Sequence, residues 1–233
     1  MRFPPLVAGR FLKRDNRFRV QVEVNGHRTF AHLPNSGRLH ELLHPGRRVY
    51  LAPQSGAHRK TPYDLMLVDL DGLLVSVDAR LPPTLFLEAW RSGRLPWLPF
   101  KASWQVKREP PCGHGRLDLL LQTPRGERLW IETKSVTWVE DGTAYFPDAP
   151  TARGRRHLAC LAQKVQQGDR AMVVFIIQRP DAQRFAPHPA DPAFPAALRM
   201  AHAQGVEIYA HRFRVTLEGM EPLDPVPVHL EGT

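Results

Sequence analysis

The sequence is poor in cysteine and has no long apolar run. Its two cysteines, Cys112 and Cys160, belong to no Cys-x-x-Cys pair, which argues against a structural zinc site. We expect two free thiols in a reducing compartment, with a disulfide as the alternative. No apolar stretch approaches the roughly 20 residues of a membrane helix, and residues 1–5 lack the apolar stretch of a secretory signal. The expected location is therefore the cytoplasm, away from any membrane.

Acidic residues are scarce at the start of the chain. Residues 1–60 hold 12 Lys and Arg but only 3 Asp and Glu, whereas the other 173 residues hold 20 of each sign. The whole net charge of +9 therefore lies in the first quarter of the chain. This asymmetry favours a surface that faces a polyanion, and nucleic acid is the expected partner. A solubilising, Arg-rich face is the alternative.

Several well-known motifs are also missing. The sequence has no Walker loop, dinucleotide fingerprint or Gly-x-Ser-x-Gly elbow, and no helix-turn-helix is evident, so base-specific readout is not expected. His40 and His44 match the His-Glu-x-x-His pattern of zinc proteases. That chemistry needs a sustained helix and a third ligand, whereas Pro45-Gly46 ends the segment at once. We interpret the segment as a turn between strands.

Residues 10–80 alternate in the way that short β-strands do. Phe18, Val20, Val22 and Val24 fall on one face of a strand, and the Asn25-Gly26 step after them is the strongest short hairpin signal. Five short strands with a brief helical turn near residues 39–43 favour a small barrel of the OB type, a fold that commonly binds nucleic acids. The expected strands are residues 17–24, 28–33, 47–52, 63–70 and 73–78.

The rest of the chain indicates an α/β domain after a Pro-rich junction at residues 81–100. The apolar run at residues 171–178 is typical of a strand covered on both faces, and the C-terminal tail is expected to be ordered only by docking. We place the boundary after residue 82, which gives an OB-like domain over 1–82 and an α/β domain over 83–233. Other expected strands are residues 104–108, 116–122, 129–135 and 206–211, with helices at 84–91, 155–167 and 195–204.

The residues that could do chemistry are Asp118, Glu132 and Lys134. Side chains alternate along a strand, so Glu132 and Lys134 face the same way, and a hairpin can bring Asp118 beside Glu132. Two carboxylates this close are costly unless a cation lies between them, and Mg²⁺ accepts two carboxylates together with waters and phosphate oxygens. The lysine can orient the attacking water or offset charge in the transition state. The alternative is a surface ion pair.

Several basic and turn residues are candidates for holding DNA phosphates. Arg153 and Arg156 crowd a helix start, where backbone N–H groups also favour anions; a solvated helical face is the alternative. The loop with Asn35, Ser36 and Arg38 can offer N–H groups and a guanidinium to a phosphate, although ordinary turn chemistry explains it equally well. The expected DNA-binding set is completed by Arg17 and by Arg59 and Lys60, from the basic loop that begins at His58.

Blocks of sequence along nearly the whole chain, from about residue 10 to residue 209, resemble the sugar fermentation stimulation protein A (SfsA) family. The most specific block is Phe146-Pro147-Asp148-Ala149. Others are residues 31–37, 59–63, 116–120, 132–137 and 150–158. The resemblance implies an α+β protein with an N-terminal OB-like β-barrel and a C-terminal α/β domain of the restriction-endonuclease-like, PD-(D/E)xK type. Family members are described as binding DNA non-specifically and are proposed regulators of genes for sugar, especially maltose, utilisation.

The resemblance also implies site residues. In the nuclease-like superfamily an Asp precedes a Glu-x-Lys motif, which falls here on Asp118, Glu132 and Lys134, and the two carboxylates would hold Mg²⁺ or Mn²⁺. Thr133 stands where the family usually has Val. We expect this change to matter little, because residue 133 should face away from the pair. The Pro82-Pro83 step and Gly115 also depart from the family pattern, which puts loop contacts in doubt.

Two functions therefore compete at this point. The first is a Mg²⁺-dependent nuclease that holds DNA through its phosphates without strong sequence preference. The second is a non-catalytic DNA-binding regulator that keeps the nuclease fold as a platform. The complete triad favours the first, and the family description favours the second. Direct sugar binding has little support because the aromatic residues are few and not clustered, and the sequence leaves an oligomer possible.

Overall fold

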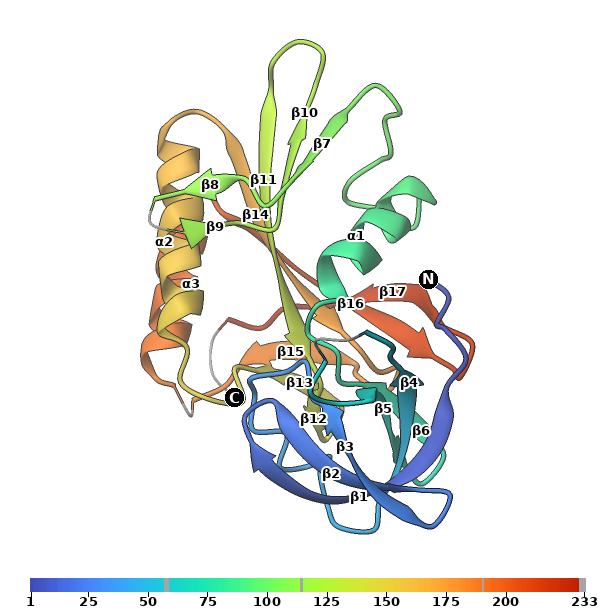
Figure 1. The fold of residues 1–233 in the computed structure, drawn as a ribbon. Coiled ribbons are helices and arrows are strands. Elements are labelled where there is room, and N and C mark those ends of the chain that lie inside the picture. The colour runs from blue at the N-terminus through green and yellow to red at the C-terminus, as the bar shows by residue number, and fades with distance from the viewer. Residues whose placement is uncertain (57–58, 114, 190, 231–233) are drawn as a thin grey trace.

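The structure, a computed structural model, describes residues 1–56, 59–113, 115–189 and 191–230. Figure 1 shows a β-barrel at the lower end of the molecule and, above it, a mixed sheet flanked by helices. The chain runs through the barrel first and then through the upper domain. The order expected from the sequence, β-barrel followed by α/β domain, is therefore the observed one.

The barrel is closed by a pairing between its third and fifth strands. The sheet order is β3-β2-β1-β4-β5-β6, and β3 pairs with β5 in parallel. Side chains such as Val20, Leu33 and Leu51 fill the interior and are fully buried. The strands are β1 (Val7–Asn16), β2 (Arg19–Val24), β3 (His27–His32), β4 (Arg48–Pro53), β5 (Tyr63–Leu70) and β6 (Leu73–Ser76).

Two expectations for the barrel were wrong. Strand β1 was not predicted, because register shifts between Phe11 and Lys13 and between Arg14 and Asn16 interrupt the alternation of apolar residues. Phe18 was placed with the core valines, but it lies in the turn between β1 and β2 and is 47% exposed. Residues 40–42 form a turn without a helix, as the following Pro45-Gly46 step predicts.

The second domain is built on a six-stranded sheet in the order β17-β16-β14-β11-β10-β7. Its three central strands β11, β14 and β16 are parallel to one another. Strand β14 alternates between two cores and is buried on both faces, as its apolar run predicts. The strands are β7 (Gln105–Arg108), β10 (Leu119–Gln122), β11 (Arg128–Val136), β14 (Arg170–Ile177), β16 (Glu207–Val215) and β17 (Met220–Val226).

Helices cover both faces of this sheet. Helices α2 (Ala152–Gln166) and α3 (Ala193–Ala203) pack on one face, and α1 (Pro82–Arg91) packs on the other (Figure 1). The junction expected at residues 81–100 is thus part of the core, since Phe86 and Trp90 are buried. None of the helices in the described part of the chain is long and apolar enough to cross a membrane.

Both chain ends contribute to the second domain. The C-terminal tail was expected to be ordered only by docking, but strand β17 pairs with β16 and lies at the edge of the sheet. The N-terminal residues lie beside the start of β17, because the Phe3 N–H donates to the Glu218 carbonyl and the Met220 N–H donates to the Met1 carbonyl. The first residues of the chain therefore lie on the second domain and not on the barrel.

Two smaller elements lie beside the six-stranded sheet of the second domain. A three-stranded sheet is formed by β12 (Trp138–Glu140), β13 (Thr143–Phe146) and β15 (Arg184–Pro187), and a short hairpin by β8 (Pro111–Cys112) and β9 (Gly115–Arg116). The expectation of two free thiols was wrong: Cys112 in this hairpin forms a disulfide with Cys160 in α2. The two cysteines are 48 residues apart in sequence, so their spacing carries no signal of the pairing.

Candidate functional site

Glu132 lies at the centre of the candidate site because β11 is a central strand whose one face is covered by α2. Alternation along β11 directs Glu132 and Lys134 to that face, and the side chain of Glu132 is only 4% exposed. The Lys134 ammonium donates a hydrogen bond to Glu132 Oε1. Glu132 and Lys134 therefore form an ion pair, as the alternative interpretation of the motif proposed, but the pair is largely buried and does not lie on a solvated surface.

Asp118 reaches the same place from the preceding strand. Strand β10 pairs with β11 only as far as Leu119 opposite Ile131, which leaves the next N–H groups of β11 without a strand partner on that side. The Asp118 carboxylate takes this role: Oδ2 accepts hydrogen bonds from the Thr133 N–H at 2.7 Å and the Thr133 hydroxyl at 2.6 Å. Residue 133 alternates away from Glu132 and Lys134, as expected, but its N–H and hydroxyl both contact Asp118, which was not predicted from the sequence.

His157 completes the cluster and was not among the predicted site residues. It lies on α2, where Nδ1 contacts Glu132 Oε1 and is 3.3 Å from the Lys134 ammonium. The helix start is fixed by Thr151, whose hydroxyl caps the Gly154 N–H, and by buried Asp191, which accepts the Thr151 N–H. These contacts hold the first turns of α2, and thus His157, against β11.

The electrostatics of the two carboxylates differ in direction. Burial, followed by the negative charge of Glu132, raises the pKa of Asp118, even though the Thr133 hydrogen bonds and Lys134 act against it. Burial also favours the neutral form of Glu132, but Lys134 and His157 outweigh it, so the pKa of Glu132 is lowered. Glu132 is thus held as a carboxylate, and its repulsion of Asp118 remains.

The cluster has the features that a hard cation requires. Glu132 Oε2 is buried and accepts no hydrogen bond in the described structure, while both hydrogen bonds on Asp118 go to one oxygen, Oδ2. No group of three His, Cys, Asp or Glu side chains that could hold a metal occurs among the described residues. The two carboxylates alone suit Mg²⁺ or Mn²⁺, which keep several waters and take one or two carboxylates.

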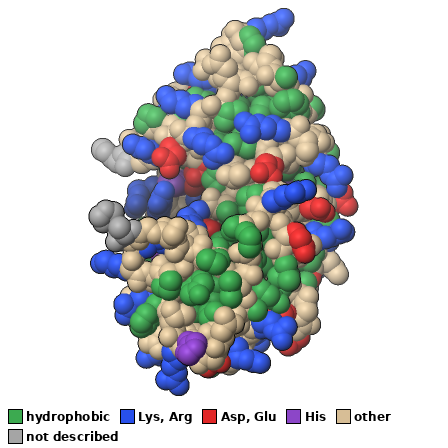
Figure 2. Space-filling view, turned by 45° about the vertical axis from the view of Figure 1, so that its right-hand side comes forward, with side chains coloured by type: hydrophobic (Ala, Val, Ile, Leu, Met, Phe, Trp, Pro, Cys, Tyr) green, Lys and Arg blue, Asp and Glu red, His purple; other side chains and the backbone are tan. Residues whose placement is uncertain are grey.

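Arg153 and Arg156 lie on the first turns of α2, beside this cluster. Arg153 is exposed, and its Nε donates to His157 Nε2 at 3.3 Å. Arg156 is exposed as well. Arg155, in contrast, is tied to the buried Asp191 carboxylate, which makes it part of the helix anchor. Figure 2 shows Lys and Arg side chains gathered, on the left of the view, around a hollow where the upper and lower parts of the molecule meet.

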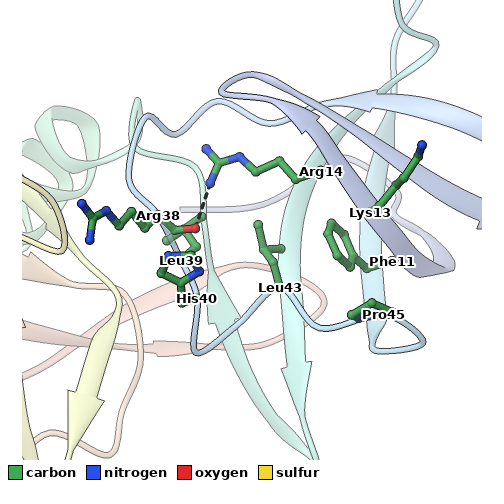
Figure 3. Close-up of a pocket in the computed structure, with 8 residues that line it drawn as sticks. All are labelled: Phe11, Lys13, Arg14, Arg38, Leu39, His40, Leu43 and Pro45. Carbon is green, nitrogen blue, oxygen red and sulfur yellow. Dashed lines mark hydrogen bonds between the residues drawn. The ribbon is translucent and has the colours of Figure 1, made fainter.

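The loop with Asn35, Ser36 and Arg38 lies between the two domains. The Asn35 amide is buried and used internally, donating to the Val77 carbonyl and accepting the Gly37 N–H. Ser36 and Arg38 are exposed. Arg14 supports the loop, with one guanidinium nitrogen donating to the carbonyls of Gly37 and Arg38. The dashed line in Figure 3 is one of these bonds.

A pocket of about 370 Å³ lies beside this loop on the barrel (Figure 3). Its floor is apolar, with Phe11 and Leu43, and Figure 3 shows Arg38 and Lys13 on opposite sides of it. The pocket lies on the barrel and shares no residue with the acidic cluster. His40 of the His-Glu-x-x-His segment also lines it.

Asp148 connects the loop to the second domain. Its Oδ2 accepts the Leu39 N–H at 3.2 Å, and its carboxylate fills the space that a side chain at Gly37 would need. A second connection is made by Gln178, which accepts the Ser76 N–H at its carbonyl and donates to the Asp78 carbonyl. We call these contacts the interdomain clasp. Thr151 and not Asp148 caps helix α2, and Asp148 anchors the barrel.

The remaining predicted DNA-binding residues are distributed over the barrel. Arg17 is exposed in the turn before β2, and Lys60 is exposed in the loop before β5. The Arg59 guanidinium is engaged with the buried Asp64 carboxylate. His58, which begins the same basic loop, lies outside the described residues.

Comparisons with known proteins agree with this architecture. A family model described as the SfsA N-terminal OB domain matches residues 12–77, and one described as the sugar fermentation stimulation protein RE domain matches residues 80–219. The chain is 45% identical over 226 residues to a sugar fermentation stimulation protein homolog of Natranaerobius thermophilus, covering 96% of this chain and 94% of that protein. It is 46% identical over 227 residues to a homolog of Moorella thermoacetica, covering 97% of each.

A solved structure is also similar over the full length. The structure of Pyrococcus furiosus SfsA in complex with Ca²⁺ has a TM-score of 0.90 and 34% identity to this chain, covering 98% of each. Together the matches confirm the fold class expected from the sequence, an OB barrel followed by a restriction-endonuclease-like domain.

Proposed function

Because this chain belongs to the SfsA (sugar fermentation stimulation protein) family, we propose that it is a DNA-binding protein whose second domain cleaves phosphodiester bonds with Mg²⁺ or Mn²⁺. In this proposal residues 1–82 hold the nucleic acid and residues 83–233 carry the chemistry. Asp118 and Glu132 bind the cation, and Lys134 acts beside them.

The observation that carries the proposal is a deficit of positive charge. The buried Glu132 carboxylate and the partly buried Asp118 carboxylate face one ammonium group, and the buried Glu132 Oε2 has no hydrogen-bond donor among the described residues. An unpaired buried carboxylate oxygen is costly, and a pair of like charges raises that cost. A divalent cation would remove both penalties. The relative solved in complex with Ca²⁺ supports this interpretation, because Ca²⁺, Mg²⁺ and Mn²⁺ all prefer oxygen ligands.

Each nearby side chain has a role that its contacts support. The cation, when bound, would stabilise charge on the phosphate and make a water more acidic. Lys134 lies within hydrogen-bond distance of Glu132 and His157, so its ammonium can offset the charge that develops on the phosphate. His157 holds Glu132 Oε1 and so keeps Oε2 available. Arg153 contacts His157 and is exposed, which suits a phosphate contact.

DNA would be held mainly through its phosphates. The candidates that are exposed and form no ion pair among the described residues are Arg17, Ser36, Arg38, Lys60, Arg153 and Arg156. Asn35 and Arg59 would act indirectly, by shaping their loops. Such binding depends on the release of counterions, so affinity should fall steeply between low and moderate salt and depend little on sequence. An affinity that is insensitive to salt would contradict this part of the proposal.

A non-catalytic regulator is the second candidate. The name of the relatives refers to sugar fermentation, which fits control of genes for the use of sugars, including maltose. On this alternative the chain would bind DNA through the same surface and leave it intact. Cleavage is therefore the measurement that separates the two functions.

The experiment incubates duplex and single-stranded DNA with the protein and Mg²⁺ or Mn²⁺, with a chelator as blank. Asp118→Ala and Lys134→Ala should lower the cleavage rate by about 10²–10³-fold, and His157→Ala by about 10–100-fold. Asp141→Ala and Lys107→Ala, which remove exposed groups of the same charge, are the matched controls. Equal cleavage by wild type and the Asp118 variant would remove the catalytic assignment, whereas intact binding without any cleavage would favour the regulator.

A further inference from the structure

The barrel exposes two phenylalanines that its core does not use. Among the described residues, five large hydrophobic side chains are exposed, and two of them, Phe18 at 47% and Phe30 at 39%, lie on the barrel. Isolated apolar residues on a surface need no explanation, but two aromatics on one face do. We call the surface formed by Phe18, Phe30, Arg19 and His32 the Phe18–Phe30 face.

The backbone places these side chains together. Strands β2 and β3 are antiparallel, with Arg19 opposite His32 and Gln21 opposite Phe30. Their inward positions are taken by Val20, Val22 and Ala31, so the alternate positions point outward. The Phe18 ring centroid is 6.2 Å from that of His32, in the turn that leads into β2.

Positive charge surrounds the two rings. The Arg19 guanidinium lies 4.9 Å from the centroid of the Phe30 ring, which is a cation–π distance. Asp15 pairs with Arg19 and Lys13 and so neutralises part of this charge, and Glu23 adds a further acid on β2. Arg17 and Arg28 are exposed and enter no ion pair among the described residues, so the face retains free cations.

We propose that the Phe18–Phe30 face binds the unpaired bases of single-stranded DNA. Exposed rings stack on bases, and arginines between them bind the phosphates that follow, which is how sequence-tolerant single-strand binding works. The face also lies on the second and third strands of the barrel, the strands that OB folds use for oligonucleotides. A duplex offers phosphates but keeps its bases stacked inside, so a binder of duplex backbone has no use for the two rings.

The proposal deepens the proposed function by naming the substrate: DNA with a single-stranded segment. It rests on the proposed function only for the choice of DNA as the nucleic acid. The face is also connected to the rest of the site. Arg14 donates to the carbonyls of Arg17, Gly37 and Arg38, which ties the turn that carries Phe18 to the loop at the second domain.

Fluorescence anisotropy with a labelled oligothymidylate measures this binding in the full-length protein. The double variant Phe18→Ala/Phe30→Ala should weaken it by at least about tenfold, because stacking contributes appreciably at each base. Phe18→Tyr/Phe30→Tyr should bind like wild type, since the rings remain. Phe100→Ala, which removes another exposed phenylalanine in the second domain, is the matched control. Melting temperatures of all variants test whether they are folded.

A second probe separates stacking from charge. An abasic oligonucleotide of the same length has the same phosphates, so wild type should bind it more weakly than oligothymidylate, and the double alanine variant should bind the two alike. Retention of wild-type affinity by the double alanine variant would overturn the proposal. So would an equal loss of affinity for duplex DNA. Conversion of a self-associated protein into a monomer, with oligothymidylate affinity unchanged, would assign the face to contact between copies of the chain instead.

Failure here is distinguishable from failure of the proposed function. Cleavage of DNA with unchanged oligothymidylate binding by the alanine variant would leave the nuclease assignment in place and remove the Phe18–Phe30 face. Loss of oligothymidylate binding in a protein that cleaves nothing would do the reverse. An oligouridylate of equal length checks the choice of DNA, and tighter binding to it would contradict that choice.

Discussion

Each domain holds a pair of carboxylates away from most solvent contact, and the two pairs are built differently: both acids of the barrel pair are buried, whereas Asp118 of the second pair is half-buried. In the barrel, Asp64 and Asp78 are 2% and 1% exposed and face two guanidinium groups, those of Arg59 and Arg80. Asp64 has one arginine on each oxygen, and both Asp78 oxygens accept from Arg80. The charges balance, and all four oxygens have donors.

The pair in the second domain is balanced in neither respect. Asp118 and Glu132 face one ammonium group, and Glu132 Oε2 has no donor. Hydrogen bonding to Asp78 and burial act in opposite senses on Arg80, and the net effect raises its pKa. Burial and Glu132 raise the pKa of Asp118. In this comparison, a missing counter-charge and not burial alone is what distinguishes the candidate functional site from the structural cluster.

The largest effect is expected from removing the counter-charge of the barrel pair. Arg80→Ala leaves Asp78 with only the backbone N–H of residue 80 as a donor and Asp64 with only Arg59, and uncompensated buried charge should lower the free energy of unfolding by about 4 kcal/mol. Urea denaturation measures this change. Arg28→Ala, at an exposed arginine of the same domain, should change it by less than roughly 0.5 kcal/mol. Equal stabilities of the two variants would show that the barrel cluster is not structural.

His211 is a buried titratable group that belongs to neither cluster. It is fully buried in β16, and burial lowers its pKa to about 4. Its unfolded pKa is near 6.5, so the unfolded chain binds more protons between these values. Stability should therefore be intact above pH 6.5 and fall by up to about 3 kcal/mol as the pH drops toward 4.

The comparison variant for this prediction is His211→Leu, which cannot titrate. Once their difference at neutral pH is subtracted, the urea midpoints of wild type and variant should coincide near neutral pH and separate at low pH, where wild type alone loses stability if the histidine is the cause. Parallel curves for the two proteins would assign the acid sensitivity to other groups.

The smallest expected effect is that of replacing one aspartate by asparagine, which should change stability in opposite directions in the two clusters. Asp118→Asn removes the repulsion from Glu132 while its amide oxygen can still accept from Thr133, so it should stabilise the metal-free protein by about 1 kcal/mol. Asp64→Asn, in the balanced cluster, should destabilise. Unfolding in the presence of a chelator measures both changes. Added Mn²⁺ should raise the melting temperature of wild type but not of Asp118→Asn, and a loss of stability in Asp118→Asn would contradict the charge deficit.

The local sequence pattern was enough to predict that Asp118, Glu132 and Lys134 lie together. Alternation put Glu132 and Lys134 on one face, and the hairpin brought Asp118 to their edge. The pattern did not reveal that Thr133 contacts Asp118, because β10 begins one residue after Asp118 and the carboxylate, in place of a paired strand, accepts the Thr133 N–H. A period of two describes a paired strand and not the place where pairing stops.

Contacts between segments far apart in the sequence could not be predicted from local pattern. His157 meets Glu132 only because the crossover helix α2 packs on β11, and Cys160, one turn later, meets the β8–β9 hairpin through the same packing. The one local hint for His157 was its position four residues after Arg153, which puts both on one helix face. Arg59 and Asn35 looked like ligands because loops rich in polar residues serve structure and binding alike.

The interdomain clasp has a consequence for any product of this protein. Asp148 holds the loop at Gly37 and Leu39, and Gln178 holds the barrel at Ser76 and Asp78, so the barrel is not free to swing. A DNA strand bound by the barrel would therefore reach the acidic cluster at a fixed distance from the point where it is bound. Cleavage would then give fragments of a single length, measured from the bound end of the DNA. Substitutions that weaken the interdomain clasp would broaden the distribution of fragment lengths.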